Sequence, residues 1–337
     1  MRLLRTVLVA VSAAGFAFPA QAQEDLWAPG AEMLIPGHWY FGSGYRYQTI
    51  RLPRIDNAMR SLPSAAALTT LEPDFAANGF NGSIGYVYRQ GAYPAWLGQN
   101  LRVEVNGWWV TANHSSTGGN FGTIPAISLF RIDGVNSGIA GAHLDTSSSI
   151  RVVSQQWQIA LRAATDYPLA PQWYLSPEIA IIGGRQLDDY KLFERGVQTA
   201  TFNDQRIYDV NTTRIGGQFG TRLTYKPINT VALHVGGYVG MLHTSASLKA
   251  LEVFSTGTPV IINVSDNRSA AALIAGGQAG IAISGGFFTI SLVGGVDYNS
   301  KVAGVRVPTF ADSAPISIVF DNAVNYHAMA TLKLRIP

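Results

Sequence analysis

The sequence predicts an all-β fold: a transmembrane, antiparallel, up-and-down β-barrel of about ten strands, with short turns at one end and long loops at the other. Three observations predict it. Segments that alternate apolar and polar residues recur along the chain. The connections between them alternate between short and long. No stretch after Phe18 is apolar enough for a membrane-spanning helix, and only helices and closed barrels satisfy all backbone groups in lipid.

The composition supports this prediction. Charged residues make up 13% of the 337 residues, against about 25% in ordinary soluble chains. Hydrophobic residues reach 47%, and the chain contains 35 glycines. There is no cysteine, which excludes a lipoprotein and a disulfide-stapled secreted domain. The net charge of +3 is too small to indicate a nucleic-acid partner.

The N-terminus predicts export. Two arginines precede an apolar run that ends at Phe18, and the small-residue site Ala20-Gln21-Ala22 follows, as in a secretory signal peptide. The predicted organisation is a signal peptide over 1–22, a periplasmic leader over 23–37 and an outer-membrane β-barrel over 38–337.

Ten alternating segments are the predicted strands. Their lengths fit the roughly 9–11 tilted residues with which a strand crosses a bilayer. They are His38–Ile50, Phe80–Gln90, Leu101–Asn113, Ile150–Thr165, Gln172–Gly184, Asn211–Lys226, Val231–Leu248, Ala270–Ser284, Gly286–Tyr298 and Asn325–Ile336.

The connections predict the orientation. The chain turns tightly after every even-numbered segment. After the odd-numbered segments come loops rich in Pro, Gly, Ser and Asn, over about 51–79, 114–149, 185–210, 249–269 and 299–324. Short periplasmic turns and long extracellular loops are typical of outer-membrane barrels. We therefore expect the chain in the outer membrane of a Gram-negative bacterium, in contact with its lipid and lipopolysaccharide.

One face of the ten segments is free of charge. In Val231–Leu248, for example, this face presents Val231, Leu233, Val235, Gly237, Val239 and Met241. A charged side chain at the bilayer midplane would cost about 2–4 kcal/mol. The uncharged face is therefore predicted to meet lipid.

The opposite face collects charges and is the candidate site. Its cations outnumber its anions, and strand direction places most of them near the periplasmic end. The predicted lumen-lining residues are Arg46, Arg89, Arg102, Glu104, Arg162, Glu178, Arg214, Arg222, Lys333 and Arg335, and Asp297, His234 and His327 share their face. Two interpretations stay open. The side chains interlock across a narrow lumen and plug it, or unpaired guanidinium groups line a passage for small anions.

No catalytic residue, cofactor or metal site is predicted, and the chain is interpreted as not being an enzyme. A hydrolase site at the external rim is the least favoured hypothesis, because no candidate lies in a recognisable motif. The rim candidates are His143, Asp145, Asp188, Asp189, His243 and Asp297.

Two stretches resemble parts of known outer-membrane proteins. The glycine-rich "RIGGQFGTRLTYKPINTVALHVGGYVGMLHTSASL" (Arg214–Leu248) resembles a hairpin of the family of the Legionella major outer-membrane protein. This resemblance implies a porin-like barrel and no catalytic residues. The final strand, "NYHAMATLKLRIP", is similar to the signal that the barrel-assembly machinery reads, which implies this machinery as a partner. The strand ends in Pro337 where that signal usually has an aromatic residue.

The predicted function is that of a porin-like or structural outer-membrane protein, whose Arg-rich lumen passes or binds small anionic solutes. The alternative is a surface-binding or adhesive barrel that acts through its extracellular loops, chiefly those at 51–79 and 114–149.

Overall fold

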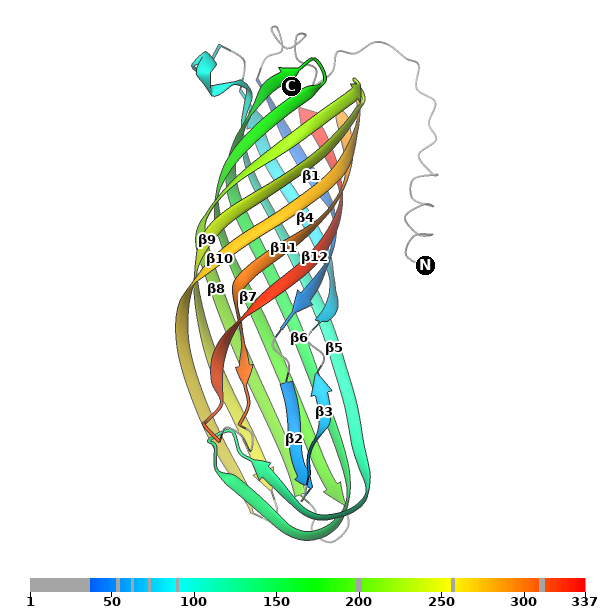
Figure 1. Ribbon diagram of the computed structural model, residues 1–337, viewed down its shortest axis with the longest axis vertical. Coiled ribbons are helices and arrows are strands. Elements are labelled where there is room, and N and C mark those ends of the chain that lie inside the picture. Colours follow the sequence, from blue (N-terminus) through cyan, green and yellow to red (C-terminus); the bar gives the residue numbers. More distant parts are fainter. Residues whose placement is uncertain are drawn as a thin grey trace.

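The computed structural model describes residues 37–52, 55–61, 64–71, 74–88, 91–197, 202–255, 258–308 and 313–336. The predicted signal peptide, the leader up to residue 36, and Pro337 lie outside these residues. Twelve strands form one sheet, in which β2 and β3 are a side hairpin and the other ten close into an antiparallel ring. The predicted fold class is confirmed (Figure 1).

The ring strands run in sequence order, and each pairs with its neighbours along the chain. β12 pairs with both β11 and β1, which closes the ring, and β5 pairs with β6. The strands are β1 (His38–Arg51), β4 (Asp74–Val87), β5 (Gln99–Phe130), β6 (Asn136–Ala170), β7 (Trp173–Val197), β8 (Phe202–Ile228), β9 (Val231–Ser255), β10 (Pro259–Gly285), β11 (Phe288–Arg306) and β12 (Ser317–Ile336).

The remaining elements lie in two connections. The hairpin of β2 (Ile55–Ser61) and β3 (Ser64–Leu71) follows β1, and β2 pairs briefly with the distal part of β5. The short 3₁₀ helix η2 (Ala95–Leu97) lies between β4 and β5. We name the end of the barrel with the β6–β7, β8–β9 and β10–β11 turns periplasmic, and the opposite end extracellular, as the sequence predicts.

No helix among the described residues is long and apolar enough to cross a membrane.

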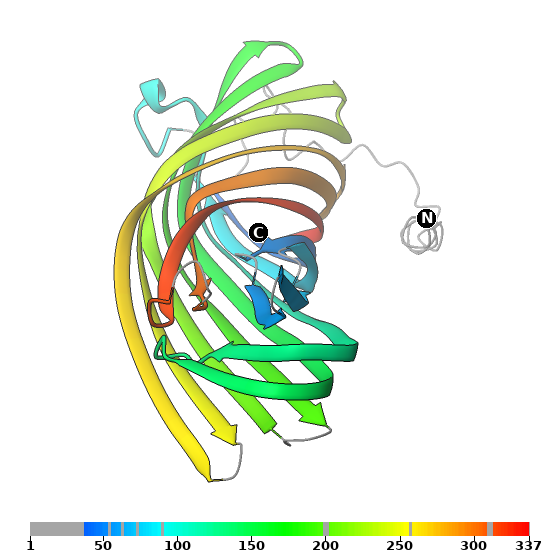
Figure 2. The ribbon, with the colours of Figure 1, turned by 60° about the horizontal axis from the view of Figure 1, so that its bottom comes forward.

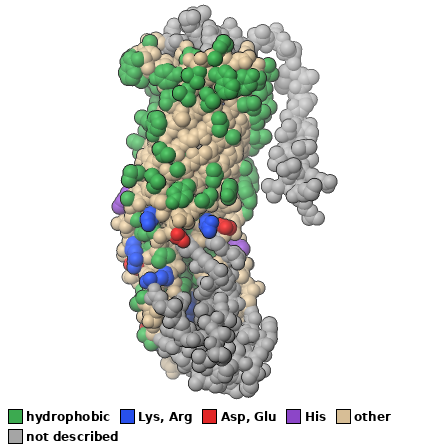
Figure 3. Space-filling view, in the orientation of Figure 1, with side chains coloured by type: hydrophobic (Ala, Val, Ile, Leu, Met, Phe, Trp, Pro, Cys, Tyr) green, Lys and Arg blue, Asp and Glu red, His purple; other side chains and the backbone are tan. Residues whose placement is uncertain are grey.

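The outer wall is apolar over only part of its length. Hydrophobic side chains cover the part nearer the C-terminus in Figure 3, and the charged side chains visible on this face gather beyond it. On β7, the exposed Ile179 and Ile181 belong to the apolar part, and Arg185, Asp189 and Lys191 follow on the same face. We call the apolar-walled part of the barrel the membrane half; on β7 it covers 173–184, and the extracellular half covers 185–197.

The predicted loops over 114–149, 185–210 and 249–269 are wrong, because these residues are mostly strand. β5 and β6 are 32 and 35 residues long, and β7, β8 and β9 also continue far beyond their predicted ends. Alternation persists there, but the two faces exchange polarity. On β7, Tyr190 and Leu192 are buried inside the barrel, while Lys191 is exposed. Apolar side chains that face the interior along this charged part of the wall are removed from water.

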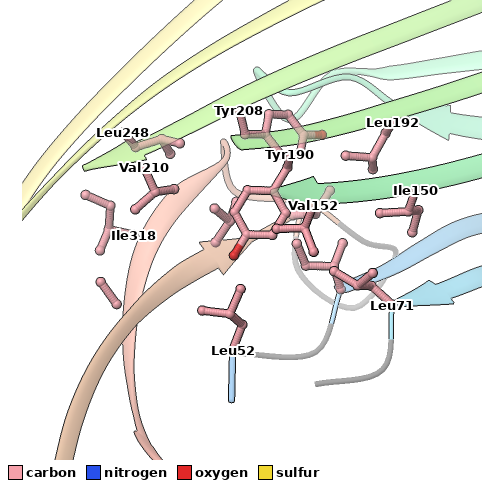
Figure 4. Close-up of a cluster of buried hydrophobic side chains, with 14 of the residues drawn as sticks. Leu52, Leu71, Ile150, Val152, Tyr190, Leu192, Tyr208, Val210, Leu248 and Ile318 are labelled. Atoms are coloured by element: carbon pink, nitrogen blue, oxygen red, sulfur yellow. The ribbon is translucent and has the colours of Figure 1, made fainter. Parts of the chain in front are cut away.

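The interior of the extracellular half is a hydrophobic core. Its buried side chains come from the ring strands and from the connections that fold into the mouth (Figure 4), and they include Leu52, Leu71, Ile150, Val152, Tyr190, Leu192, Tyr208, Val210, Leu248 and Ile318. The β5–β6 hairpin bends across this end of the barrel (Figure 2). The extracellular half is therefore filled, and the lumen that positions the site lies in the membrane half.

Candidate functional site: the Arg-rich lumen

The membrane half encloses a cavity of about 420 Å³. Inward-facing side chains of the ring strands line it, because alternation sends every second residue into the lumen. Eight cationic and four anionic side chains face it: Arg46, Arg102, Arg162, Arg214, Arg222, Lys226, Lys333 and Arg335, with Glu104, Asp166, Glu178 and Asp297. The cavity therefore carries an excess of fixed positive charge.

Nine of the ten residues predicted to face the lumen line this cavity, and the tenth, Arg89, lies outside the described residues. Sequence reasoning missed Asp166 and Lys226. Both lie just beyond or at the end of a predicted segment, on the same face as Arg162 and Arg222 respectively. Extending the alternation to the true strand ends would have found them.

Glu104 is the best-satisfied charge in the cavity. Its Oε2 lies 2.9 Å from Nζ of Lys333 and accepts a 2.7 Å hydrogen bond from the hydroxyl of Tyr40. Its Oε1 accepts a 2.8 Å hydrogen bond from Asn106. The ammonium of Lys333 also lies 4.9 Å from the centre of the Tyr40 ring, within cation–π distance. These contacts link β1, β5 and β12 inside the lumen. The negative charge of Glu104 and the positive charge of Lys333 balance each other.

A second carboxylate, Asp297 on β11, gathers groups from three other strands. Its Oδ2 lies 2.8 Å from Nδ1 of His327, and its Oδ1 accepts a 2.8 Å hydrogen bond from the hydroxyl of Tyr238. The guanidinium of Arg46 approaches to 3.9 Å and stacks 4.4 Å from the centre of the Trp108 ring. These contacts fill the extracellular side of the cavity.

Toward the periplasmic end, Arg102 lies 3.2 Å from Oδ1 of Asp166. The same oxygen accepts a 2.5 Å hydrogen bond from Ser176. Arg162 and Glu178 form a looser pair at 3.7 Å. These two ion pairs fix guanidinium groups against the wall between β5, β6 and β7.

Arg222 differs from these residues. Among the described residues, no carboxylate lies within 4 Å of its guanidinium, and its Nε is buried without a hydrogen-bond partner. Arg214 similarly donates to the neutral Gln186 at 2.5 Å and forms no ion pair within the described ranges. The lumen is thus neither a fully neutralised plug nor an unobstructed ring of cations. It is partly interlocked, and two guanidinium groups on β8 form no ion pair within 4 Å among the described residues.

A polar layer around Asp188 separates this cavity from the extracellular core. Asp188 lies beyond the apolar belt and is fully buried. It accepts hydrogen bonds from Ser154 at 2.6 Å and from Gln186 at 2.7 Å. Burial raises the pKa of Asp188 to about 6, because removing the carboxylate from water penalises its charged form.

The rim candidates are not brought together. Asp188 points inward, Asp189 and His243 are exposed on the outer wall, and Asp297 lies inside the lumen. The side chains of His143 and Asp145 lie outside the described residues. Within the described ranges, no group of three or more His, Asp and Glu side chains is arranged to hold a metal ion.

Comparison with known proteins finds similarity among solved structures alone. No family model matches the chain, and no curated protein matches it. Among solved structures, the outer-membrane protease OmpT from Escherichia coli is similar over 89% of this chain and 96% of that chain, at 8% identity and a TM-score of 0.42. The toluene transporter TbuX from Ralstonia pickettii is similar over 92% of each chain, at 8% identity and a TM-score of 0.25. A Pseudomonas aeruginosa FadL homologue is similar over 95% of each chain, at 9% identity and a TM-score of 0.24.

Two interpretations of the sequence change accordingly. The chain forms a closed antiparallel β-barrel, but nothing supports the finer resemblance to the Legionella major outer-membrane protein. The exclusion of an enzyme is also wrong. A protease stands among the structures similar in fold, so the barrel architecture does not exclude enzymatic activity.

Proposed function

We propose that this chain is an outer-membrane β-barrel that binds small anionic solutes in its lumen, entering from the periplasmic end. The lining of the cavity reaches the periplasmic turns at Lys226 and Phe287. The extracellular half is closed by its hydrophobic core. A solute in the lumen is therefore held at a site rather than passing freely through.

The guanidinium of Arg222, which forms no ion pair within 4 Å among the described residues, carries this proposal. A cation in a narrow lumen without a carboxylate in contact is unfavourable, because little water remains to solvate it. An anion in the cavity would supply the missing charge and accept hydrogen bonds from the planar guanidinium, which suits carboxylate and phosphate groups. Arg222 lines the same cavity as Lys226 and Arg335, so an entering anion meets cations along the way.

Titration of the refolded protein in detergent with inorganic phosphate tests this function. Arg222→Gln keeps a polar side chain and removes the guanidinium and its charge, and we expect it to weaken phosphate binding by about tenfold, which corresponds to about 1.4 kcal/mol. Arg185→Gln is the matched control. Arg185 lies exposed on the outer wall, where it donates to Asn211 at 2.7 Å, so its removal should leave binding unchanged. Equal affinity of the wild type and Arg222→Gln would contradict the proposal.

The surface-binding alternative gains no support from the geometry. Segments 51–79 and 114–149, which it requires as free loops, largely form β2, β3 and the distal parts of β5 and β6. These elements pair with one another.

A further inference from the structure

The connection between β5 and β6 inserts its tip into the barrel. The tip covers 131–135, and its Ile132 is completely buried in the extracellular core. The backbone N–H of Ile132 donates a 2.8 Å hydrogen bond to Oε2 of Glu252 on β9. The carbonyl of Ile132 accepts a 2.8 Å hydrogen bond from the N–H of Ile316. One buried residue thus ties the tip to the wall and to the β11–β12 connection.

The backbone of the tip is shaped for this insertion. Gly134 has a φ of +83°, and a Cβ at this position would lie 2.1 Å from the carbonyl oxygen of Ser313. Only glycine combines this conformation with such a close approach. The next residue, Val135, points away from the core and is 51% exposed. Of the two apolar side chains of the tip, Ile132 therefore enters the barrel and Val135 stays in water.

The group that anchors the tip is electrostatically unbalanced. Around Glu252 lie Asp204 and Arg206 from β8 and Glu194 from β7, all buried. Nε of Arg206 lies 3.1 Å from Oε1 of Glu252, and Arg206 also contacts Asp204. One guanidinium thus contacts two of the three carboxylates, and both carboxylate oxygens of the third, Glu194, lack a hydrogen-bond partner among the described residues.

Within the described residues, the other elements packed here add no compensating charge. The phenol of Tyr208 on β8 also faces the cluster, and burial raises its pKa further above the range in which carboxyl groups titrate. β10 presents the apolar Ile262 opposite Glu252. On the tip, Arg131 and Asp133 pair with each other. The closed arrangement therefore keeps negative charge in a site shielded from water, which is unfavourable unless protons are taken up.

We propose that the 131–135 tip is a releasable plug, which closes the extracellular end of the lumen and is held in place by the protonated form of the Glu194–Asp204–Glu252 cluster. The plug would regulate the anion site proposed above. The inference rests on that function only for the identity of the solute. A withdrawn tip would expose the cluster to water and remove Ile132 from the core.

The direction of the pH dependence follows from burial. Desolvation raises the pKa of Glu252 to about 7 and that of Asp204 to about 6, and it also raises the pKa of Glu194. In water these carboxyl groups titrate near pH 4. Between about pH 4 and 7 the closed state thus binds more protons than the open state. Acid favours closure, and closure weakens as the pH rises through 7.

Single-channel recording of the refolded protein in planar bilayers, with the pH varied on the extracellular side, tests the plug. We expect the open probability of the wild type to rise at least fivefold from pH 5 to pH 8. Glu252→Gln keeps an acceptor for the Ile132 N–H without a charge, so it should stay as closed at pH 8 as the wild type is at pH 5.

Substitutions in the tip test its insertion by the same recording. Ile132→Asp should raise the open probability at least tenfold at pH 5. Val135→Asp, on the exposed side of the same tip, should stay within twofold of the wild type.

A labelling experiment covers the case in which Ile132→Asp does not fold. The chain has no cysteine, so Ile132→Cys and Val135→Cys each introduce a single thiol. We expect the ratio of their labelling rates with a membrane-impermeant maleimide to rise at least fivefold from pH 5.5 to pH 8. The ratio cancels the pH dependence that the two thiols share.

The outcomes separate the two proposals. A constant labelling ratio, or wild-type opening that increases in acid, overturns the plug. Phosphate binding that depends on Arg222 would in that case leave the lumen function standing. Opening that follows the plug prediction without any phosphate binding supports the plug and removes the anion site.

Discussion

The two halves of the barrel use one alternating pattern in opposite senses. In the membrane half, Ile179 and Ile181 of β7 face outward and Glu178 faces the cavity. In the extracellular half of the same strand, Tyr190 and Leu192 are buried inside and Lys191 is exposed. The parity of the strand does not change. What changes is the outer surface of the wall, which is apolar along the first part and charged along the second.

This contrast indicates that the extracellular half contributes a packed core and the membrane half contains the candidate site. The extracellular half is built like the core of a soluble protein, with apolar side chains removed from water. The membrane half keeps polar side chains and a cavity inside, and its outer face needs lipid as a cover. We therefore expect stability to depend on the interior in one half and on the exterior in the other.

The largest effect is expected from a cavity in the extracellular core. Leu192 is 1% exposed, and Leu192→Ala should lower the free energy of unfolding by about 2–5 kcal/mol, through lost burial and the cavity that remains. Denaturant unfolding in lipid vesicles, followed by tryptophan fluorescence, measures it. The neighbouring Phe193 is 42% exposed, and Phe193→Ala should cost clearly less. Equal losses would show that this half has no packed interior.

Substitutions on the outer wall should be costly in the membrane half and nearly neutral in the extracellular half, which is the reverse of the pattern expected for the interior. Ile181 is 64% exposed in the apolar belt, and Ile181→Lys should cost about 2–4 kcal/mol of unfolding free energy if lipid covers it. On the extracellular wall, Lys191→Ala should change the stability by no more than about 0.5 kcal/mol. The same unfolding experiment compares them. A small effect of Ile181→Lys would mean that the belt does not lie in lipid.

The layer between the halves should make stability depend on pH. Because the pKa of Asp188 is raised to about 6, the folded protein binds a proton there that the unfolded chain, titrating near pH 4, has already released. Stability should therefore rise as the pH falls from 7 toward 4, with a slope from this group of at most about 1.4 kcal/mol per pH unit.

Asp188→Asn should remove that contribution to the slope, whatever it does to the stability itself. Asp189→Asn, on the exposed outer face of the same strand, should change the slope less. Unfolding curves recorded at several pH values compare the three proteins. If Asp188→Asn leaves the slope unaltered, Asp188 is not protonated on folding.

The smallest effect is expected inside the membrane half. Gln218 lines the cavity, and Gln218→Ala should change the free energy of unfolding by less than about 0.5 kcal/mol, because its side chain is not part of a close-packed interior. The contrast with Leu192→Ala is the measurement of interest. A loss of several kcal/mol would mean that the lumen is packed as tightly as the extracellular core.

Much of the barrel could be predicted from local pattern. Ten alternating segments gave the ring and its strand count, and parity indicated which residues face inward. Pro177 illustrates the limit. Because proline has no N–H for a ladder hydrogen bond, the sequence alone leads one to expect a bulge or a displaced strand at this position, but the register of β7 with β8 continues through Pro177 without a shift. The opposite positions on β6, Thr165 and Asp166, are simply not paired with β7.

Local pattern predicted the closed ring, the uncharged outer face and the excess of cations in the lumen, because these follow from the period of a strand and the cost of charge in lipid. Which charges are neutralised, and where the lumen ends, depends on contacts between distant parts of the chain. Lys333 meets Glu104 across 229 positions of the chain, and Ile132 meets Glu252 across 120. Such contacts depend on ring closure and on a hairpin folding back into the mouth. The alternation of a strand carries no information about a partner so far along the chain.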